Sequence, residues 1–184
     1  MGAERVTLRD GAELLVRPVE AIDKAAMVEG FAGFGEHSRR QRFFAPKRSL
    51  TPRELARFTE VDHDEAECLV ALDAETGAGA GAARFERLTP GGDVAEVSVS
   101  VVDAWQGRGV AGVLLERLCR RAGEVGVRTF RASVLVTNPA MRRAFERLGK
   151  TSLRGSDAGV AELDIDLPVA AAPDALRRAL RGPG

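Results

Sequence analysis

The sequence predicts a single α/β domain in which a mixed central β-sheet of about seven strands is flanked by about four helices. Two observations support this fold class. Short runs rich in β-branched residues alternate with amphipathic helical stretches along most of the chain. In addition, residues 94–112 pass from a strand pattern through a glycine-rich turn directly into a helical stretch. The 184 residues are enough to bury one core of ordinary size.

The expected strands are short and separated by turn residues. Asp10-Gly11 predicts a hairpin between residues 6–8 and 13–16, because glycine supplies the positive φ of a tight turn. Further strands are expected over residues 68–72, 82–88, 94–102, 129–136, 151–154 and 161–167. Glycine-rich turns at residues 77–81 and 155–159 separate two pairs of these strands.

The expected helices have recognisable ends. They cover residues 22–34, 52–60, 110–125 and 139–148. Residues 51–54 form a capping box with Pro52 at the first helical position, and Asn138 is the expected N-cap of the last helix. Ile22 is expected on the inner face of the first helix. Residues 36–46, in contrast, are too broken for a long helix.

The composition limits the classes of partner. Lys plus Arg and Asp plus Glu number 27 each, so no electrostatic attraction to nucleic acid or to an acidic membrane is expected. The N-terminus lacks a signal region and no stretch approaches the roughly 20 apolar residues that span a bilayer, which predicts a cytoplasmic protein. Residues 168–184 are interpreted as an alanine- and proline-rich tail with a short helix at 173–180.

The two cysteines indicate neither a metal site nor a disulfide. Cys68 and Cys119 lie in apolar patterns, form no CxxC motif and do not cluster with His37 or His63 in the sequence. We therefore expect buried, reduced thiols and no bound metal.

The glycine-rich turn before residue 110 has a chemical meaning. The first turn of a helix leaves about four backbone N–H groups without partners and carries about half a positive charge, which suits an anion. Gly107, Gly109 and Gly112 would let a phosphate approach the backbone closely, and Arg108 adds a mobile cation. The segment is neither a Walker loop nor a dinucleotide-binding GxGxxG turn. It predicts a site for another ligand that carries a pyrophosphate.

Two motifs carry a resemblance to a known family. Residues 106–111, Gln-Gly-Arg-Gly-Val-Ala, fit the Q/R-x-x-G-x-G/A signature, and residues 138–149 resemble an N-x-x-A-x-x-x-Y-x-x-x-G helix. Both resemble the GCN5-related N-acetyltransferases (GNAT). The resemblance implies a GNAT domain over residues 1–167. It also implies acetyl-CoA as cosubstrate and direct transfer of the acetyl group to a primary amine.

The resemblance assigns cofactor contacts residue by residue. The backbone of Val101 and Val102 would hold the pantetheine arm of acetyl-CoA. The pyrophosphate would bind the loop formed by Gln106, Gly107, Arg108, Gly109, Val110, Ala111 and Gly112. Asn138 would also touch the cofactor, with a helix N-cap role as the alternative. Phe145 stands where many family members have a tyrosine that protonates the leaving thiolate. The chain contains no tyrosine, so the usual general acid is missing and Phe145 is expected to pack against the cofactor arm.

Glu96 is the candidate catalytic base. It interrupts a strand of valine, alanine and serine about ten residues before the glycine loop, as the catalytic glutamate does in histone-type family members. Burial on such a strand would raise the pKa of the carboxyl group toward the useful range. The alternative is an outward-facing strand residue or a salt-bridge partner.

The N-terminal half bears on the acceptor. Residues 38–46, 50–52, 57–59 and 61–63 resemble the corresponding region of bacterial Pat-type protein lysine acetyltransferases, which modify acyl-CoA synthetases and related enzymes. This resemblance implies a protein substrate with an acceptor lysine. His37, Asp62 and His63 would then lie near the acceptor channel. The alternatives are a surface histidine at position 37 and a solvated acidic loop at 62–65.

The remaining alternatives concern the contacts of three arginines and the function of the whole domain. Arg39, Arg40 and Arg42 could contact an acidic protein partner or the adenine-side phosphate of the cofactor, or simply be solvated. Two other functions stay open. One is acetylation of a small-molecule amine, and the other is a non-catalytic acyl-CoA-binding sensor, which the missing tyrosine makes admissible.

Overall fold

The fold is an eight-stranded sheet with helices on both faces. The computed structural model describes residues 2–168. The strands are β1 (Glu4–Thr7), β2 (Glu13–Pro18), β3 (Ala66–Asp73), β4 (Gly79–Arg87), β5 (Val94–Val101), β6 (Thr129–Leu135), β7 (Lys150–Asp157) and β8 (Val160–Asp166). The helices are α1 (Lys24–Ala32), α2 (Glu36–Phe43), α3 (Pro52–Thr59), α4 (Val110–Glu124) and α5 (Pro139–Glu146), with short 3₁₀ turns at Ala21–Asp23 and Asp103–Trp105.

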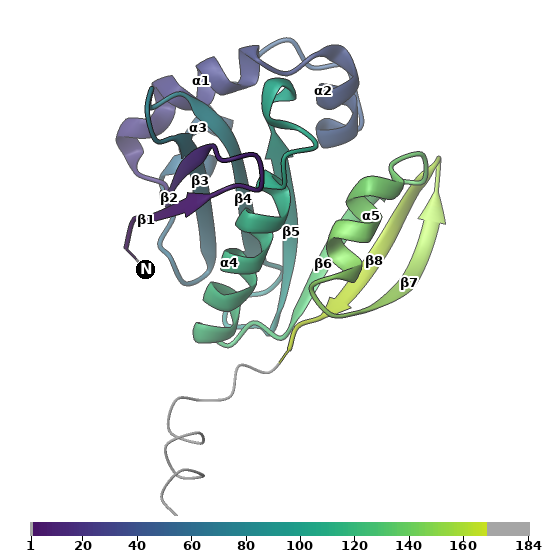
Figure 1. Cartoon of the computed structure of the whole chain (residues 1–184). Coiled ribbons are helices and arrows are strands. Elements are labelled where there is room, and N and C mark those ends of the chain that lie inside the picture. The colour runs from purple at the N-terminus through teal and green to yellow at the C-terminus, as the bar shows by residue number, and fades with distance from the viewer. Residues whose placement is uncertain (1, 169–184) are drawn as a thin grey trace, which may run out of the picture.

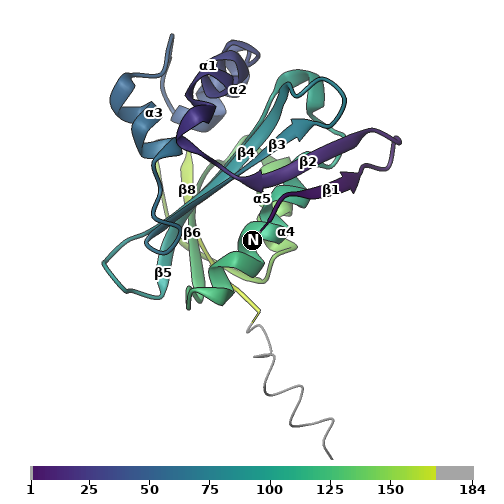
Figure 2. The same ribbon diagram turned by 90° about the vertical axis from the view of Figure 1, so that its left-hand side faces the viewer.

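The sheet runs in the order β1-β2-β3-β4-β5-β6-β8-β7. All neighbouring strands are antiparallel except β5 and β6. Figures 1 and 2 show α4 and α5 on one face of the sheet and α1, α2 and α3 on the other. The single parallel pair requires a crossover connection, and α4 supplies it. The predicted mixed α/β sheet is confirmed.

The main core lies between α4 and the sheet. Leu114, Leu115 and Leu118 of α4 are fully buried, as are Phe85 of β4 and Phe130 of β6. Burying each of these side chains contributes about 1.5–3 kcal/mol. The helical spacing of the leucines therefore fixes α4 against the centre of the sheet.

Several predicted turns and caps are confirmed. Gly11 in the β1–β2 hairpin has φ 87°. The capping box that begins α3 is present, because Thr51 and Glu54 bond each other's backbone N–H. Asn138 caps α5 by accepting a hydrogen bond from the Met141 amide at 3.1 Å.

The helices near the N-terminus differ from the prediction. The expected helix over 22–34 is a 3₁₀ turn followed by α1, and Ile22 is 82% exposed rather than on the inner face. Residues 36–43 do form a helix, α2. Glu36 in its first turn and Arg40 and Arg42 in its last turn complement the helix dipole.

Two of the predicted glycine turns are shorter in the structure than expected. Gly79 and Gly81 lie inside β4, where a Cβ on Gly81 would come within 2.7 Å of the Ser100 carbonyl oxygen on β5. Glycine at 81 therefore permits close strand approach rather than a turn. Gly155 lies inside β7 at an irregularity of register, and only Ala158-Gly159 remain in the turn.

One prediction concerns residues that the structure does not describe. The tail at 169–184 and its helix at 173–180 lie outside the described residues. Within residues 2–168, no helix combines the length and apolarity needed to cross a membrane. Both cysteines are free, with Cys68 buried and Cys119 half-buried.

A buried ion pair fixes the start of α1. Arg17 donates to both carboxylate oxygens of Asp23 at 2.7 Å, and Asp23 also accepts from the Glu20 amide. The hydrogen bonds from Arg17 lower the pKa of Asp23 below its usual value of 3.8. The Asp23 side chain is only 9% exposed, so a broken pair would leave Arg17 largely buried without its counter-ion.

We expect Asp23→Asn to lower the free energy of unfolding by about 3 kcal/mol at neutral pH, because it leaves the largely buried charge of Arg17 without its counter-ion. Because the folded-state pKa is lowered, this stabilisation is complete above about pH 4 and is lost as pH falls through the folded value. Urea denaturation of both proteins between pH 7 and pH 2 measures the difference. Glu60→Gln, which removes the exposed pair with Lys24, is the control and should change stability by less than about 1 kcal/mol. Equal stability of Asp23→Asn and the unaltered protein at pH 7 would contradict this account.

Candidate active site

The site begins where β5 and β6 separate. Their parallel pairing covers three residue pairs, from Val94 with Thr129 to Glu96 with Arg131. Beyond Glu96, β5 continues along β4 while β6 continues along β8, so the two strands diverge (Figure 1). Backbone groups of β5 and β6 that face each other beyond this point are therefore not paired across the gap.

A cleft of about 390 Å³ lies at this divergence. Its wall includes most of the predicted cofactor residues, namely Val101, Gln106, Gly107, Gly109, Val110, Ala111, Gly112, Asn138 and Phe145. Glu96 lines the same cleft. The structure thus brings the glycine loop, the candidate base and the start of α5 together around one cavity.

The loop before α4 is a glycine turn, as predicted. Gly107 and Gly109 have φ of 74° and 96°, a region that other residues rarely adopt. Gly109 is the N-cap of α4 and provides no side-chain acceptor, so the first helical amides point outward unpaired within the described chain. A Cβ on Gly107, Gly109 or Gly112 would meet nothing within 4 Å. The loop is an open cradle that fits a phosphate-bearing ligand.

Two predicted cofactor residues do not line the cleft. Arg108 donates to Asp10 of the β1–β2 hairpin at 2.5 Å and stacks 4.1 Å from the centre of the Trp105 ring. Val102 lines a second, smaller cavity, and its amide donates to the Ala80 carbonyl on β4.

Glu96 lies at the fork of the two strands. Its neighbours Ala95 and Val97 are buried under α4, whereas Glu96 is exposed on the opposite face because side chains alternate along a strand. The expected burial of this carboxylate is wrong, since the buried residues of β5 are those of the other face. Glu96 makes no hydrogen bond within the described chain, so its carboxylate is available at the wall of the cleft.

Phe145 is a packing residue. It is 2% exposed, belongs to the main core and forms part of the cleft wall. No hydroxyl group therefore stands at the position where the resemblance implies one. Ala144 beside it is also buried, so this face of α5 is tightly packed.

Asp103 connects α2 to the loop, a role that sequence reasoning missed. Its carboxylate accepts hydrogen bonds from the Gly35 amide at 3.0 Å, the Ser38 hydroxyl at 2.6 Å and the Gln106 side chain at 3.0 Å. Gln106 also donates to the Val101 carbonyl at 3.1 Å. The start of α2 is thereby held over one end of the cleft.

The predicted acceptor residues lie elsewhere. His37 is exposed on α2 and its ring contacts Gln41, which lines the cleft while His37 does not. Asp62 caps its own loop by accepting hydrogen bonds from the Asp64 and Ala66 amides. The side chain of His63 pairs with buried Glu67 at 2.8 Å.

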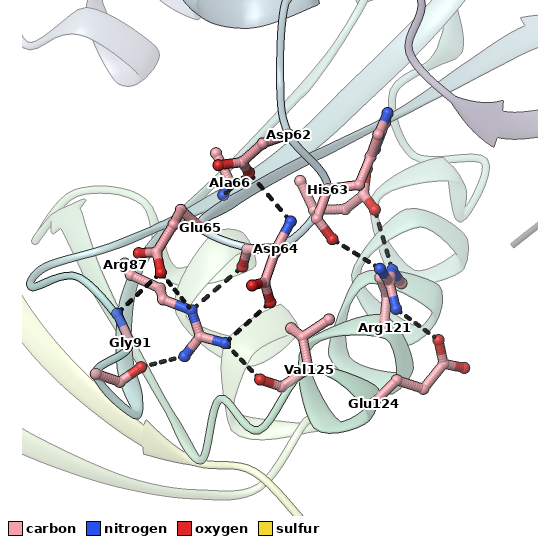
Figure 3. Close-up of polar contacts among 12 residues, drawn as sticks. Asp62, His63, Asp64, Glu65, Ala66, Arg87, Gly91, Arg121, Glu124 and Val125 are labelled. Carbon is pink, nitrogen blue, oxygen red and sulfur yellow. Dashed lines mark hydrogen bonds and ion pairs between the residues drawn. The ribbon is translucent and has the colours of Figure 1, made fainter.

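Figure 3 shows what the loop at 62–65 contacts. Arg121, near the end of α4, donates to the His63 carbonyl at 2.7 Å and to Glu67 at 3.1 Å. Arg87 pairs with the carboxylates of Asp64 and Glu65. These contacts tie the loop to the end of α4 opposite the glycine cradle. The structure does not bring Asp62 or His63 to the cleft, and their role at an acceptor channel stays a prediction.

Comparison with known proteins establishes the family. The sequence model described as the acetyltransferase (GNAT) family matches residues 34–150, which include the glycine cradle, Glu96 and α5. The chain belongs to the GNAT acetyltransferase family. The two motifs at residues 106–111 and 138–149 predicted this family, and the match confirms it.

Individual GNAT proteins resemble the chain over nearly its whole length. Acetyltransferase Pat of Mycolicibacterium smegmatis is 34% identical over 166 residues, which are 89% of this chain and 48% of Pat. The chain thus spans about half the length of that curated relative. The crystal structure of the GNAT domain of S. lividans PAT is 36% identical, with a TM-score of 0.81 and coverage of 90% of this chain and 97% of that one.

One structural relative contains the expected cofactor. The structure of yncA, a putative acetyltransferase from Salmonella typhimurium, was solved with its cofactor acetyl-CoA. It is 25% identical, with a TM-score of 0.66 and coverage of 88% of this chain and 98% of that one.

We expect Asp103→Ala to loosen α2, because it removes three hydrogen bonds that hold Gly35, Ser38 and Gln106. Hydrogen exchange of the amides in Glu36–Phe43 should become faster by roughly tenfold or more, since each bond contributes about 1 kcal/mol. Asp73→Ala is the matched control, because Asp73 likewise accepts from backbone amides, but in the β3–β4 turn. Unchanged exchange in α2 of the Asp103 variant would show that other contacts hold this helix.

Proposed function

We propose that the protein transfers an acetyl group from acetyl-CoA to a primary amine, and that the amine is the ε-amino group of a protein lysine. The observation that carries this proposal is that the uncapped N-terminus of α4 and the free carboxylate of Glu96 line one cleft. In this proposal the amides of residues 107–112 hold the pyrophosphate, and the diverging edges of β5 and β6 hold the pantetheine arm.

The chemistry assigned to the chain is mainly proton removal and positioning. A lysine ammonium has a pKa near 10.4, so deprotonation at pH 7 costs about 4–5 kcal/mol before attack. Glu96 would accept that proton, directly or through one water molecule. The thioester of acetyl-CoA supplies an activated acyl group.

Release of the sulfur does not require a general acid at position 145, where this chain has phenylalanine. The new bond joins the amine nitrogen to the carbonyl carbon, and the bond that breaks joins this carbon to the sulfur. The electron pair leaves with the sulfur as a thiolate, and the second proton of the attacking nitrogen passes to that thiolate or to solvent. A thiol of pKa near 8.5 is an adequate leaving group without a proton donor, which is compatible with a chain that contains no tyrosine.

The lysine acceptor is supported by two observations. The relatives named Pat include a GNAT domain similar over 90% of this chain. Glu96 is exposed, so a side chain presented by another protein could reach it. Cytoplasmic acyl-CoA synthetases are the proposed substrates, and the cytoplasmic location is itself part of the proposal.

We expect Glu96→Gln to lower the turnover number by roughly 100-fold or more, because the amide cannot accept the ammonium proton. The affinity for acetyl-CoA should stay nearly the same. Acetyl transfer to acyl-CoA synthetases and to lysine peptides, measured from pH 6 to pH 10, tests this. Glu13→Gln, which changes another exposed strand carboxylate, is the control. Equal turnover of Glu96→Gln and the unaltered enzyme at every pH would rule out the assigned base.

We expect Gly109→Glu to weaken binding of coenzyme A by at least tenfold, since a carboxylate would face the pyrophosphate. Calorimetric titration measures the affinity. Gly126→Glu is the control, because Gly126 also has a positive φ, 86°, but follows the other end of α4. If both variants bind coenzyme A equally well, the cradle is not the pyrophosphate site.

Substrate screening separates the alternatives. Transfer to small amines but not to proteins would favour a small-molecule acetyltransferase. Normal coenzyme A binding with no transfer to any amine would favour a non-catalytic acyl-CoA-binding module.

A further inference from the structure

A second cavity adjoins the cleft on the face of the sheet opposite α4. It has a volume of about 90 Å³ and lies between α1, α2, α3 and strands β3 to β5. Phe34, Arg42, Ser98 and Ser100 line both cavities. A short chain of atoms that leaves the cleft past Ser98 could therefore end in this cavity.

Most of the wall is apolar. Phe31, Phe43 and Phe58 come from α1, α2 and α3, and Val70 and Ala82 come from the sheet. Such walls exclude water, and an ionic interaction inside them is stronger than at the surface. Two arginines nevertheless lie among these side chains.

Arg84 of β4 is buried with an unsatisfied donor. Its side chain is 10% exposed, and its Nε makes no hydrogen bond within the described chain. One terminal nitrogen donates to Glu86 at 2.9 Å. Glu86, however, also accepts two hydrogen bonds from Arg57, at 2.9 and 2.6 Å. One carboxylate is thus shared by two guanidinium groups.

Arg42 of α2 also lacks a carboxylate partner. It is half-buried and donates to the Ser98 hydroxyl at 2.9 Å, and no Asp or Glu of the described chain forms an ion pair with it. Burial and the charge of Arg84 lower the pKa of Arg42 to about 10, although the Glu96 carboxylate acts in the opposite direction. Arg42 still carries its charge at neutral pH, so the cavity holds two neighbouring cations.

The acidic and thiol groups of the cavity do not neutralise these cations. Asp23 is the only carboxylate among the lining residues that the structure describes, and both of its oxygens are bonded to Arg17. Burial raises the pKa of the Cys68 thiol to about 12, which keeps it uncharged. Positive charge therefore exceeds negative charge inside an apolar cavity next to the proposed reaction centre.

We propose that this cavity binds a carboxylate on a short carbon chain, held by the guanidinium groups of Arg42 and Arg84. We call it the carboxylate pocket. A carboxylate offers acceptors to both guanidinium groups and supplies the missing negative charge. This inference rests on the proposed acyl transfer from coenzyme A and adds a chemical feature of one of its two substrates, because the carboxylate belongs either to the acyl group of the thioester or to the acceptor amine.

The first arm of the test concerns the acyl donor. Calorimetry compares the affinities for succinyl-coenzyme A and for 4-methylpentanoyl-coenzyme A, in which two methyl groups replace the carboxylate oxygens. If the acyl group carries the carboxylate, the protein should bind succinyl-coenzyme A at least tenfold more tightly.

The second arm concerns the acceptor. With acetyl-CoA as donor, kcat/KM is measured for leucine and 4-aminobutyrate, each against its own amide. If the acceptor carries the carboxylate, the acids should be preferred at least tenfold. A preference in either arm supports the pocket and identifies its ligand, whereas less than a threefold preference in both arms overturns it.

Variants show whether the arginines cause the preference. Arg84→Met and Arg42→Met keep a long apolar side chain but remove the charge, and each should reduce the preference to less than about threefold. Arg53→Met is the control, because Arg53 is exposed on α3, which also lines the cavity. Two variants on different elements guard against misfolding of one of them, which circular dichroism detects. A preference that survives in both folded variants also overturns the proposal.

Failure of this inference differs from failure of the proposed function. Acetylation of lysine peptides is measured in parallel. Ordinary lysine acetylation without any carboxylate preference counts against the carboxylate pocket alone. A tenfold preference in the binding arm without transfer to any amine supports the pocket and counts against the proposed function.

Discussion

The structure depends on the short parallel pairing of β5 and β6. Three residue pairs join these strands, and each then follows a different antiparallel neighbour. Because α4 provides the crossover between them, its N-terminus necessarily lies at the open end of the divergence, above the carboxyl end of β5. The cleft, the helix terminus that lines it and the position of Glu96 at the fork all follow from this one arrangement.

The two faces of β5 have different roles, one in packing and one at the candidate site. Ala95, Val97 and Val99 anchor the strand under α4, and Glu96, Ser98 and Ser100 face α1, α2 and α3. The period of two along a strand therefore places a free carboxylate and two hydroxyls on the side from which an acceptor would approach. The arginines Arg42 and Arg84 lie on that same side, which links the proposed base to the proposed carboxylate pocket.

The sequence predicted the parts of the site that depend on local backbone geometry. The glycine turn at residues 107–109, the N-cap at Asn138 and the helix at 110–124 are determined by neighbouring residues, and all were predicted. The contacts of Arg42, Asp103 and His63 join segments distant in sequence. Arg42 reaches Ser98 from α2, a helix that the sequence did not predict. His63 itself has a positive φ of 64°, and its ring contacts Glu67. No local pattern encodes such contacts, so the acceptor side was the least predictable part.

The central claim is that coenzyme A binds in the divergence of β5 and β6 with its pyrophosphate at the start of α4. Titration of the isotopically labelled protein with coenzyme A, followed by the backbone amide resonances, tests it most directly. The account predicts that the largest shift changes fall on the amides of residues 107–112 and on those of β5 beyond Glu96. Shift changes concentrated elsewhere, or none at saturating coenzyme A, would contradict it.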